Sequence, residues 1–170
     1  VEVINKFPQG NFELKMTPKG RIFFKKIADY RSPKKLYSND KVFIDHVKKT
    51  WDNEVEGNIG VALVGGKGLG KSLTGNEIAH SLNVPVIRIK EPIISMEQLS
   101  VLEDIDTNFV LILDEFEKIV EQKDSRNNQN SFITQEEILS FLDGGISRNH
   151  KMMFIVTANN DYKISEFLKN

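Results

Sequence analysis

Short runs of apolar residues alternate with amphipathic stretches along most of this chain. Four mostly apolar runs predict buried strands, at residues 59–64, 84–89, 109–113 and 151–157. Stretches between them predict helices, at residues 72–82, 95–104 and 134–142. This order indicates an α/β fold in which a parallel sheet is covered by helices on both sides.

The first forty residues differ in texture from the rest. Residues 11–16 alternate between polar and apolar side chains, a turn signal (T-P-K-G) comes next at 17–20, and residues 21–27 resume the strand pattern. These features predict a small N-terminal β-hairpin, with residues 31–35 (R-S-P-K-K) as a connector to the remainder of the chain.

Residues 39–56 predict a helix, and residues 95–98 and 134–137 each fit a capping box that opens a further one. The apolar stripe of the first of these helices is predicted to contain Val42, Phe43, His46, Val47 and Trp51. We expect His46 and Trp51 to be packing residues rather than ligands.

Residues 65–72 fit the pattern G-x-x-x-x-G-K-[ST], a loop that wraps the phosphates of a nucleotide. Its glycines allow the backbone to turn tightly and to point N–H groups at an anion. Lys71 supplies a mobile charge, the Ser72 hydroxyl is suited to ligate Mg²⁺, and the helix N-terminus after the loop faces the phosphates. We predict nucleotide contacts at Gly65, Gly66, Lys67, Gly68, Leu69, Gly70, Lys71, Ser72 and Leu73.

The apolar run 109–113 ends in two acids, Asp114 and Glu115. A central parallel strand delivers such carboxylates to its C-terminal edge. We expect Asp114 to hold Mg²⁺ with Ser72, and Glu115 to polarise a water for attack on the γ-phosphate. The alternative is a core strand with an ordinary acidic end. Because a hydrolase needs a water activator, the acid pair favours an ATPase over a small-molecule kinase.

Composition excludes several classes of protein. The 170 residues suffice for one domain with a core, and no apolar stretch approaches the length of a membrane span. Cysteine is absent, so disulfides and thiolate metal sites are excluded and a cytoplasmic location is the expectation. Net charge is -1, yet residues 19–49 are rich in Lys and Arg whereas residues 91–121 are rich in Asp and Glu. Solvated surface, complementary subunit faces or contact with a polyanion would each explain this.

The phosphate loop and the acid pair resemble those of the AAA+ ATPases. Gly65, Gly68 and Gly70 stand where the family's loop has glycines, and Ser72 replaces the usual threonine. Residues 114–115 match the acidic tip of the family's second motif. The resemblance implies a three-layer P-loop NTPase fold that uses ATP and Mg²⁺.

A third motif lies further along the chain. Residues 154–159 (F-I-V-T-A-N) look like the strand that carries the family's polar sensor, so the resemblance implies that Asn159 contacts the γ-phosphate or the attacking water. Asn160 takes this place if the register is shifted by one residue. Residues 141–144 (F-L-D-G) further resemble the branch that contains the mitochondrial Bcs1-type chaperones. The likeness covers roughly residues 41–160.

The resemblance implies a hairpin and linker over residues 1–38 and a nucleotide-binding core over residues 39–170, in a ring of identical subunits that remodels a macromolecular client. Two family features are missing from this chain, the helical lid and the arginine finger in its R-x-x-G-R setting, and we expect both beyond Asn170. Arg148 is expected to be a surface residue rather than the finger. Residues 90–95 lack the aromatic residue of a peptide-threading pore loop, which puts threading in doubt.

Two other functions remain open from the sequence. A nucleic-acid motor or loader would use the basic residues 19–49 on DNA or RNA, and its binding would weaken steeply with salt. An ATP-switched scaffold would bind nucleotide to assemble but hydrolyse little, and Glu115 counts against it.

Overall fold

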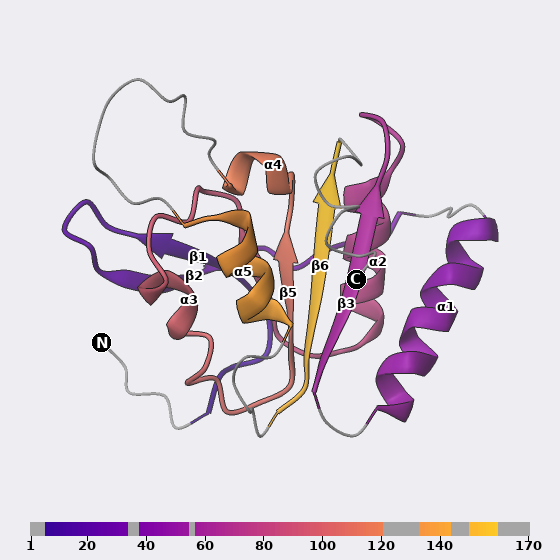
Figure 1. Cartoon of the computed structure of the whole chain (residues 1–170). Coiled ribbons are helices and arrows are strands. Elements are labelled where there is room, and N and C mark those ends of the chain that lie inside the picture. Colours follow the sequence, from indigo (N-terminus) through magenta and orange to yellow (C-terminus); the bar gives the residue numbers. More distant parts are fainter. Residues whose placement is uncertain (1–5, 34–37, 55–56, 121–132, 144–149, 160–170) are drawn as a thin grey trace.

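The computed structural model describes residues 6–33, 38–54, 57–120, 133–143 and 150–159 (Figure 1). Its centre is a six-stranded sheet with the strand order β2-β1-β4-β5-β6-β3. The strands are β1 Asn11–Met16, β2 Ile22–Ile27, β3 Asn58–Val64, β4 Val86–Ile89, β5 Phe109–Leu113 and β6 Met152–Ala158. All neighbours pair in parallel except β1 and β2, which pair antiparallel. The predicted α/β fold and the N-terminal hairpin are therefore confirmed.

Helices cover both faces of this sheet (Figure 1). The helices are α1 Ser38–Asn53, α2 Lys71–Ser81, α3 Glu97–Ser100, α4 Phe116–Ile119 and α5 Gln135–Leu142. Apolar residues of α1 and α2 form one core layer with the sheet, and those of α3 and α5 form the other. Within the described part of the chain, no helix is both long enough and apolar enough to cross a membrane.

Strand β5 is buried from end to end. Phe109, Leu111 and Leu113 enter the core layer under α3 and α5, whereas Val110 and Ile112 enter the layer under α1 and α2. A continuous apolar run is the pattern of a strand covered on both faces, so propensity and burial agree here. The acids that come after β5 are thereby delivered from a rigid strand to the edge where β3 and β6 also end.

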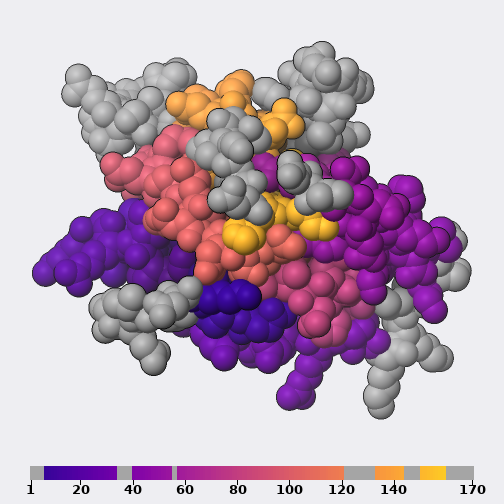
Figure 2. Space-filling model, turned by 90° about the horizontal axis from the view of Figure 1, so that it is seen from below, coloured from indigo at the N-terminus to yellow at the C-terminus, as the bar shows by residue number. Residues whose placement is uncertain are grey.

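The N-terminal hairpin extends the sheet. Strand β1 pairs with β4 through the partners Asn11 and Val86, Phe12 and Ile87, and Glu13 and Arg88. Phe12 is 5% exposed, and Phe7 packs edge-on against it with ring centroids 5.1 Å apart. From below, the indigo hairpin and the magenta α1–β3 region lie at opposite ends of the molecule (Figure 2). The division of the chain into a hairpin and linker over residues 1–38 and a core over residues 39–170 stays a prediction.

The apolar stripe predicted for α1 is partly wrong. Val42 is 72% exposed and Phe43 38% exposed, whereas the buried residues are Ile44, Val47 and Trp51. His46 is also exposed, so its expected packing role is wrong, whereas that of Trp51 is confirmed. The buried stripe of α1, at positions 44, 47 and 51, is narrow because α1 docks beside α2 on one side alone.

One predicted capping box is confirmed and the other is only half formed. Thr134 accepts a hydrogen bond from the Glu137 backbone N–H while the Glu137 carboxylate accepts from the Thr134 N–H, and α5 begins at the next residue. The hydrogen bond from the Thr134 N–H lowers the pKa of Glu137. At residues 95–98 the Gln98 side chain accepts from the Ile94 and Ser95 N–H groups, but Ser95 gives no side-chain cap and α3 ends at Ser100.

We expect Trp51→Ala to lower the free energy of unfolding by about 3–5 kcal/mol, because the indole is packed between α1 and the sheet. Lys151 adds to the contact, with its Nζ atom 4.6 Å from the ring centroid and a 2.7 Å hydrogen bond to the Trp51 carbonyl. Val42→Ala on the exposed side of the same helix should change stability by about 0.5 kcal/mol or less. Urea unfolding followed by far-UV circular dichroism measures both, and equal losses would contradict the assigned stripe.

Candidate active site

The predicted phosphate loop connects the end of β3 to the first turn of α2. Gly68 and Gly70 both have φ of 82°, a left-handed conformation that glycine adopts without strain. A Cβ at either position would meet nothing within 4 Å, so backbone conformation rather than space requires glycine there. Helix α2 begins at Lys71, directly after Gly70. Its first N–H groups therefore face the loop, where an anion is favoured.

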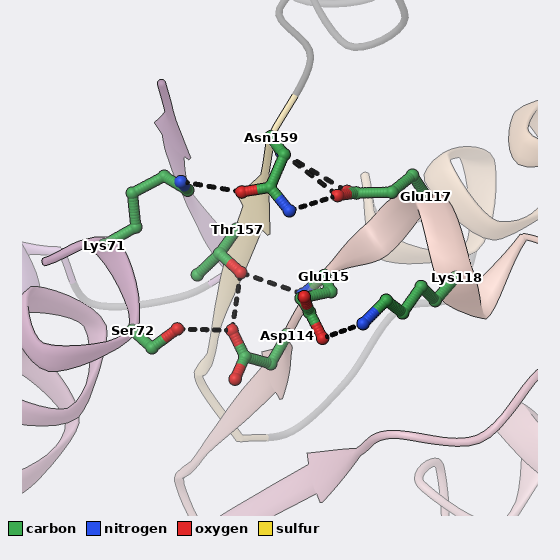
Figure 3. A network of polar contacts seen from close by, with 8 residues as sticks. All are labelled: Lys71, Ser72, Asp114, Glu115, Glu117, Lys118, Thr157 and Asn159. Atoms are coloured by element: carbon green, nitrogen blue, oxygen red, sulfur yellow. Dashed lines mark hydrogen bonds and ion pairs between the residues drawn. The ribbon is translucent and has the colours of Figure 1, made fainter. Parts of the chain in front are cut away.

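Lys71 reaches back across the loop (Figure 3). Its Nζ atom donates to the carbonyl oxygens of Gly65 at 2.8 Å and Gly66 at 2.7 Å, and to Oδ1 of Asn159 at 2.9 Å. An ammonium has three donors, so these contacts use all of them.

Asp114 collects two hydroxyl groups at the end of β5. The Ser72 hydroxyl donates to its Oδ1 atom at 2.8 Å, and the Thr157 hydroxyl donates to the same atom at 2.6 Å (Figure 3). Thr157 is 1% exposed and lies on β6, so the acid is tied to both the helix after the loop and the neighbouring strand. Oxygen donors in this arrangement are the ones Mg²⁺ prefers.

Glu115 comes next, with a backbone in the left-handed region, at φ 54° and ψ 60°. This conformation is uncommon outside glycine, and here a hydrogen bond from the Glu115 N–H to the Thr157 hydroxyl oxygen, at 2.9 Å, helps hold it. The carboxylate contacts Lys118 with 2.6 Å between Oε2 and Nζ. That hydrogen bond raises the pKa of Lys118.

Asn159 lies at the end of β6 and bridges the loop to α4. Its Oδ1 accepts from Lys71, and its Nδ2 donates to Oε1 of Glu117 at 2.7 Å. The backbone N–H of Asn159 also donates to both Glu117 oxygens, at 3.2 and 3.4 Å. Asn159 therefore contacts the lysine of the loop, and its role as a sensor stays a prediction. Asn160 and Arg148 fall outside the described residues.

The predicted site residues form two hydrogen-bonded groups, which lie next to each other because Lys71 and Ser72 are neighbours at the start of α2. Lys71 joins Asn159, Ser72 joins Asp114, and Glu115 is linked to Asp114 through one Thr157 hydroxyl. The remaining predicted positions line the loop or the start of α2: Gly65, Gly66, Lys67, Gly68, Leu69, Gly70 and Leu73. Leu69 is 75% exposed at the loop, and Leu73 is 36% exposed.

The residues present fit a nucleotide with Mg²⁺. Ser72 and Asp114 offer two hard oxygen donors, which suits a cation that keeps waters and takes phosphate oxygens as its other ligands. Among the described residues no three His, Cys, Asp or Glu side chains gather as a protein-only metal site.

Three residues of the site were missed at the sequence level: Thr157, Glu117 and Lys118. Thr157 is the one polar residue within the buried run 152–158, which is a signal that could have marked it. Glu117 and Lys118 come two and three residues after Glu115 and gain their meaning only because α4 turns back toward β6. Sequence spacing alone does not show that turn.

A loop with glycines between β3 and α2, together with acids at the end of β5, defines the class of P-loop nucleotide-binding proteins. A scan against protein-family models matches residues 61–170 to AAA, the ATPase family associated with various cellular activities. The match covers more than half of the chain, and the chain therefore belongs to this family of ATPases. A search of the curated proteins finds no match.

We expect Thr157→Val to lower the free energy of unfolding by about 1–3 kcal/mol, because the half-buried Glu115 N–H loses its acceptor. Thr157→Ser should retain most of that stability, since it keeps the hydroxyl. Thr50→Val, in which the lost hydroxyl bonds a carbonyl on the surface of α1, is the matched control and should change stability little. Chemical denaturation compares the three, and equal losses for Val and Ser at position 157 would contradict the bridging role.

Proposed function

We propose that this protein binds ATP with Mg²⁺ and hydrolyses the bond between its β- and γ-phosphates. The observation that carries the proposal is that Lys71, Asn159, Ser72, Asp114 and Glu115 gather at the C-terminal edge of three neighbouring parallel strands. This set supplies a phosphate-binding cation, two metal donors, a water-activating carboxylate and a polar sensor. Membership of the AAA family supports the same function.

The roles follow from the chemistry of each group. Backbone N–H groups of residues 66–72 cradle the phosphates, and Lys71 leaves its carbonyl partners to neutralise charge on the outer phosphates. Ser72 and Asp114 would hold Mg²⁺, which would supply neutralisation of phosphate charge. Glu115 accepts a proton from the attacking water, and Asn159 orients that water. ATP is favoured over GTP because the family favours it and because the chain has no Asn-Lys-x-Asp run.

The finer assignments belong to the same proposal. We propose a ring of identical subunits that remodels a macromolecular client, with an arginine from a neighbouring subunit completing the site. Such an arginine contributes about 10³ to 10⁵ in rate where it has been measured, so isolated subunits should turn over slowly. A cytoplasmic location rests on the cysteine-free composition, and the Bcs1-type branch rests on residues 141–144.

The placement of the basic residues in 19–49 does not favour nucleic-acid binding. The hairpin that carries Lys25 and Lys26 lies at the β2 edge of the sheet, whereas α1, which carries Lys48 and Lys49, docks next to α2 at the β3 end (Figure 2). Basic residues that are adjacent in sequence are therefore separated in space. A continuous track for a phosphate backbone would need them on one face.

We expect Glu115→Gln to lower kcat by about 10²-fold or more while MgATP binding is retained, because the water loses its proton acceptor. Lys71→Ala should instead weaken MgATP binding by about tenfold or more, since a charged hydrogen-bond donor is lost. Lys48→Ala, at an exposed position of α1, is the control and should behave as wild type. Steady-state phosphate release and titration with a fluorescent ATP analogue measure the two effects. Unchanged turnover in Glu115→Gln would overturn the assignment.

Turnover per subunit should rise with protein concentration if a neighbouring subunit completes the site. Phosphate release is measured over a dilution series, and the mass of the particle is followed by light scattering under the same conditions. Turnover that stays constant per subunit while the mass changes would contradict a shared site. Assembly that requires ATP, without turnover at any concentration, would favour the ATP-switched scaffold.

A further inference from the structure

The side-chain amide of Asn159 lies between a group that can only donate and a group that can only accept. Lys71 Nζ is 2.9 Å from Oδ1, and Glu117 Oε1 is 2.7 Å from Nδ2. An ammonium has no acceptor and a carboxylate has no donor, so one orientation of the amide satisfies both and the flipped orientation satisfies neither. The oxygen of Asn159 therefore faces Lys71, and its NH₂ group faces α4 (Figure 3).

Glu117 is the residue that sets this orientation. It accepts from Nδ2 and from the backbone N–H of Asn159, so it holds the residue at two points. Asn159 is exposed and lies one residue beyond the end of β6, where the ladder with β3 no longer restrains it. Lys71 alone would donate equally well to a water or to any other oxygen in place of this amide, so the acidic partner on α4 determines which end points at the loop.

We propose that Glu117 is a positioning residue that makes Asn159 present its oxygen, and not its NH₂ group, to the water that attacks the phosphate. The inference rests on the ATP hydrolysis proposed above and assigns the chemistry of the sensor within it. A phosphate oxygen accepts hydrogen bonds, so the Asn159 oxygen cannot bind it directly. It can accept from Lys71 and from the attacking water.

The two acceptors then divide the two hydrogens of that water. One O–H points to the Glu115 carboxylate and the other to Oδ1 of Asn159, which leaves a lone pair of the water oxygen for the phosphorus. In the hydrolytic step, the bond from water oxygen to phosphorus forms and the bond from phosphorus to the ADP oxygen breaks. The proton from water passes to Glu115. Asn159 keeps its oxygen in place throughout because Glu117 holds its other end.

Reversing the polarity of the pair tests this assignment. Asn159→Asp keeps an oxygen toward Lys71 but sets a second carboxylate against Glu117, and we expect kcat to fall about tenfold or more with KM changed much less. Glu117→Gln alone should have a smaller effect, because its amide oxygen still accepts from Asn159. In the double variant Glu117→Gln/Asn159→Asp, the new glutamine donates to the aspartate, and kcat should recover several-fold from that of Asn159→Asp.

The rival assignment gives the opposite result. If Asn159 donates its NH₂ group to the γ-phosphate, Asp at position 159 lacks that donor in every background, and the double variant will be no better than Asn159→Asp. Glu117→Ala/Asn159→Asp is the matched control, because it removes the same charge but cannot donate. Recovery with Gln but not with Ala supports the positioning role, and equal recovery or none overturns it. Glu136→Gln, exposed on α5, controls for loss of an acid elsewhere.

A second measurement separates this inference from the proposed function. A double-mutant cycle on the free energy of unfolding reports the contact between positions 117 and 159 whether or not the protein turns over. Absence of coupling would overturn the orientation of Asn159 by itself. If the wild type binds MgATP but releases no phosphate at any concentration while the cycle shows coupling, then the proposed hydrolysis fails and the contact stands. If the wild type hydrolyses ATP and the polarity reversal shows no recovery, the positioning role alone fails.

Discussion

The site depends on the position of β6 between β3 and β5. Parallel pairing of β6 on both sides brings three carboxyl ends to one edge of the sheet, so residues from three distant parts of the chain meet. The buried Thr157 hydroxyl then fixes the end of β5 relative to β6, because it donates to the Asp114 carboxylate and accepts from the Glu115 N–H. A strand that only filled the core would need no hydroxyl there. Burial of the Thr157 hydroxyl costs little free energy, because the hydroxyl both donates and accepts a hydrogen bond.

Much of the fold and most of the site could be predicted because local signals agreed with long-range packing. The apolar run of β5, the glycine loop and the acid pair each carry a pattern that one physical arrangement explains, and the confirmed cap of α5 is local as well.

Predictions were wrong where contacts with another part of the chain determine the structure. Which side of α1 is exposed depends on how this helix docks beside α2. The spacing of apolar residues within α1 does not determine that docking. The residues at 95–98 carry a helix-start signal, and Gln98 does accept from the Ser95 N–H, but this local signal does not determine that α3 ends at Ser100. Glu117 and Lys118 were missed because their partners lie across a turn of the backbone.

The charged groups of the site are satisfied by the protein itself. Lys71 is bound by three oxygens, the Glu115 carboxylate by Lys118, and the Glu117 carboxylate by Asn159. Exposed pairs of this kind contribute little net stability and exchange readily. Binding of a triphosphate would therefore replace one set of partners by another rather than create charge interactions from nothing. Affinity would reflect the difference between the two sets.

The hairpin also changes what the sheet offers to other molecules. Without β1 and β2, the edge of β4 would expose unpaired backbone groups next to the buried core, and such an edge invites another chain to add a strand. The hairpin covers that edge, and the outer strand β2 carries exposed Lys25 and Lys26. Lysines on an outer strand repel a second copy of themselves and discourage pairing from edge to edge. Protection against aggregation is thus built into a segment at the opposite end of the sheet from β3 and the nucleotide loop, and a shortened chain would lose it before it lost its chemistry.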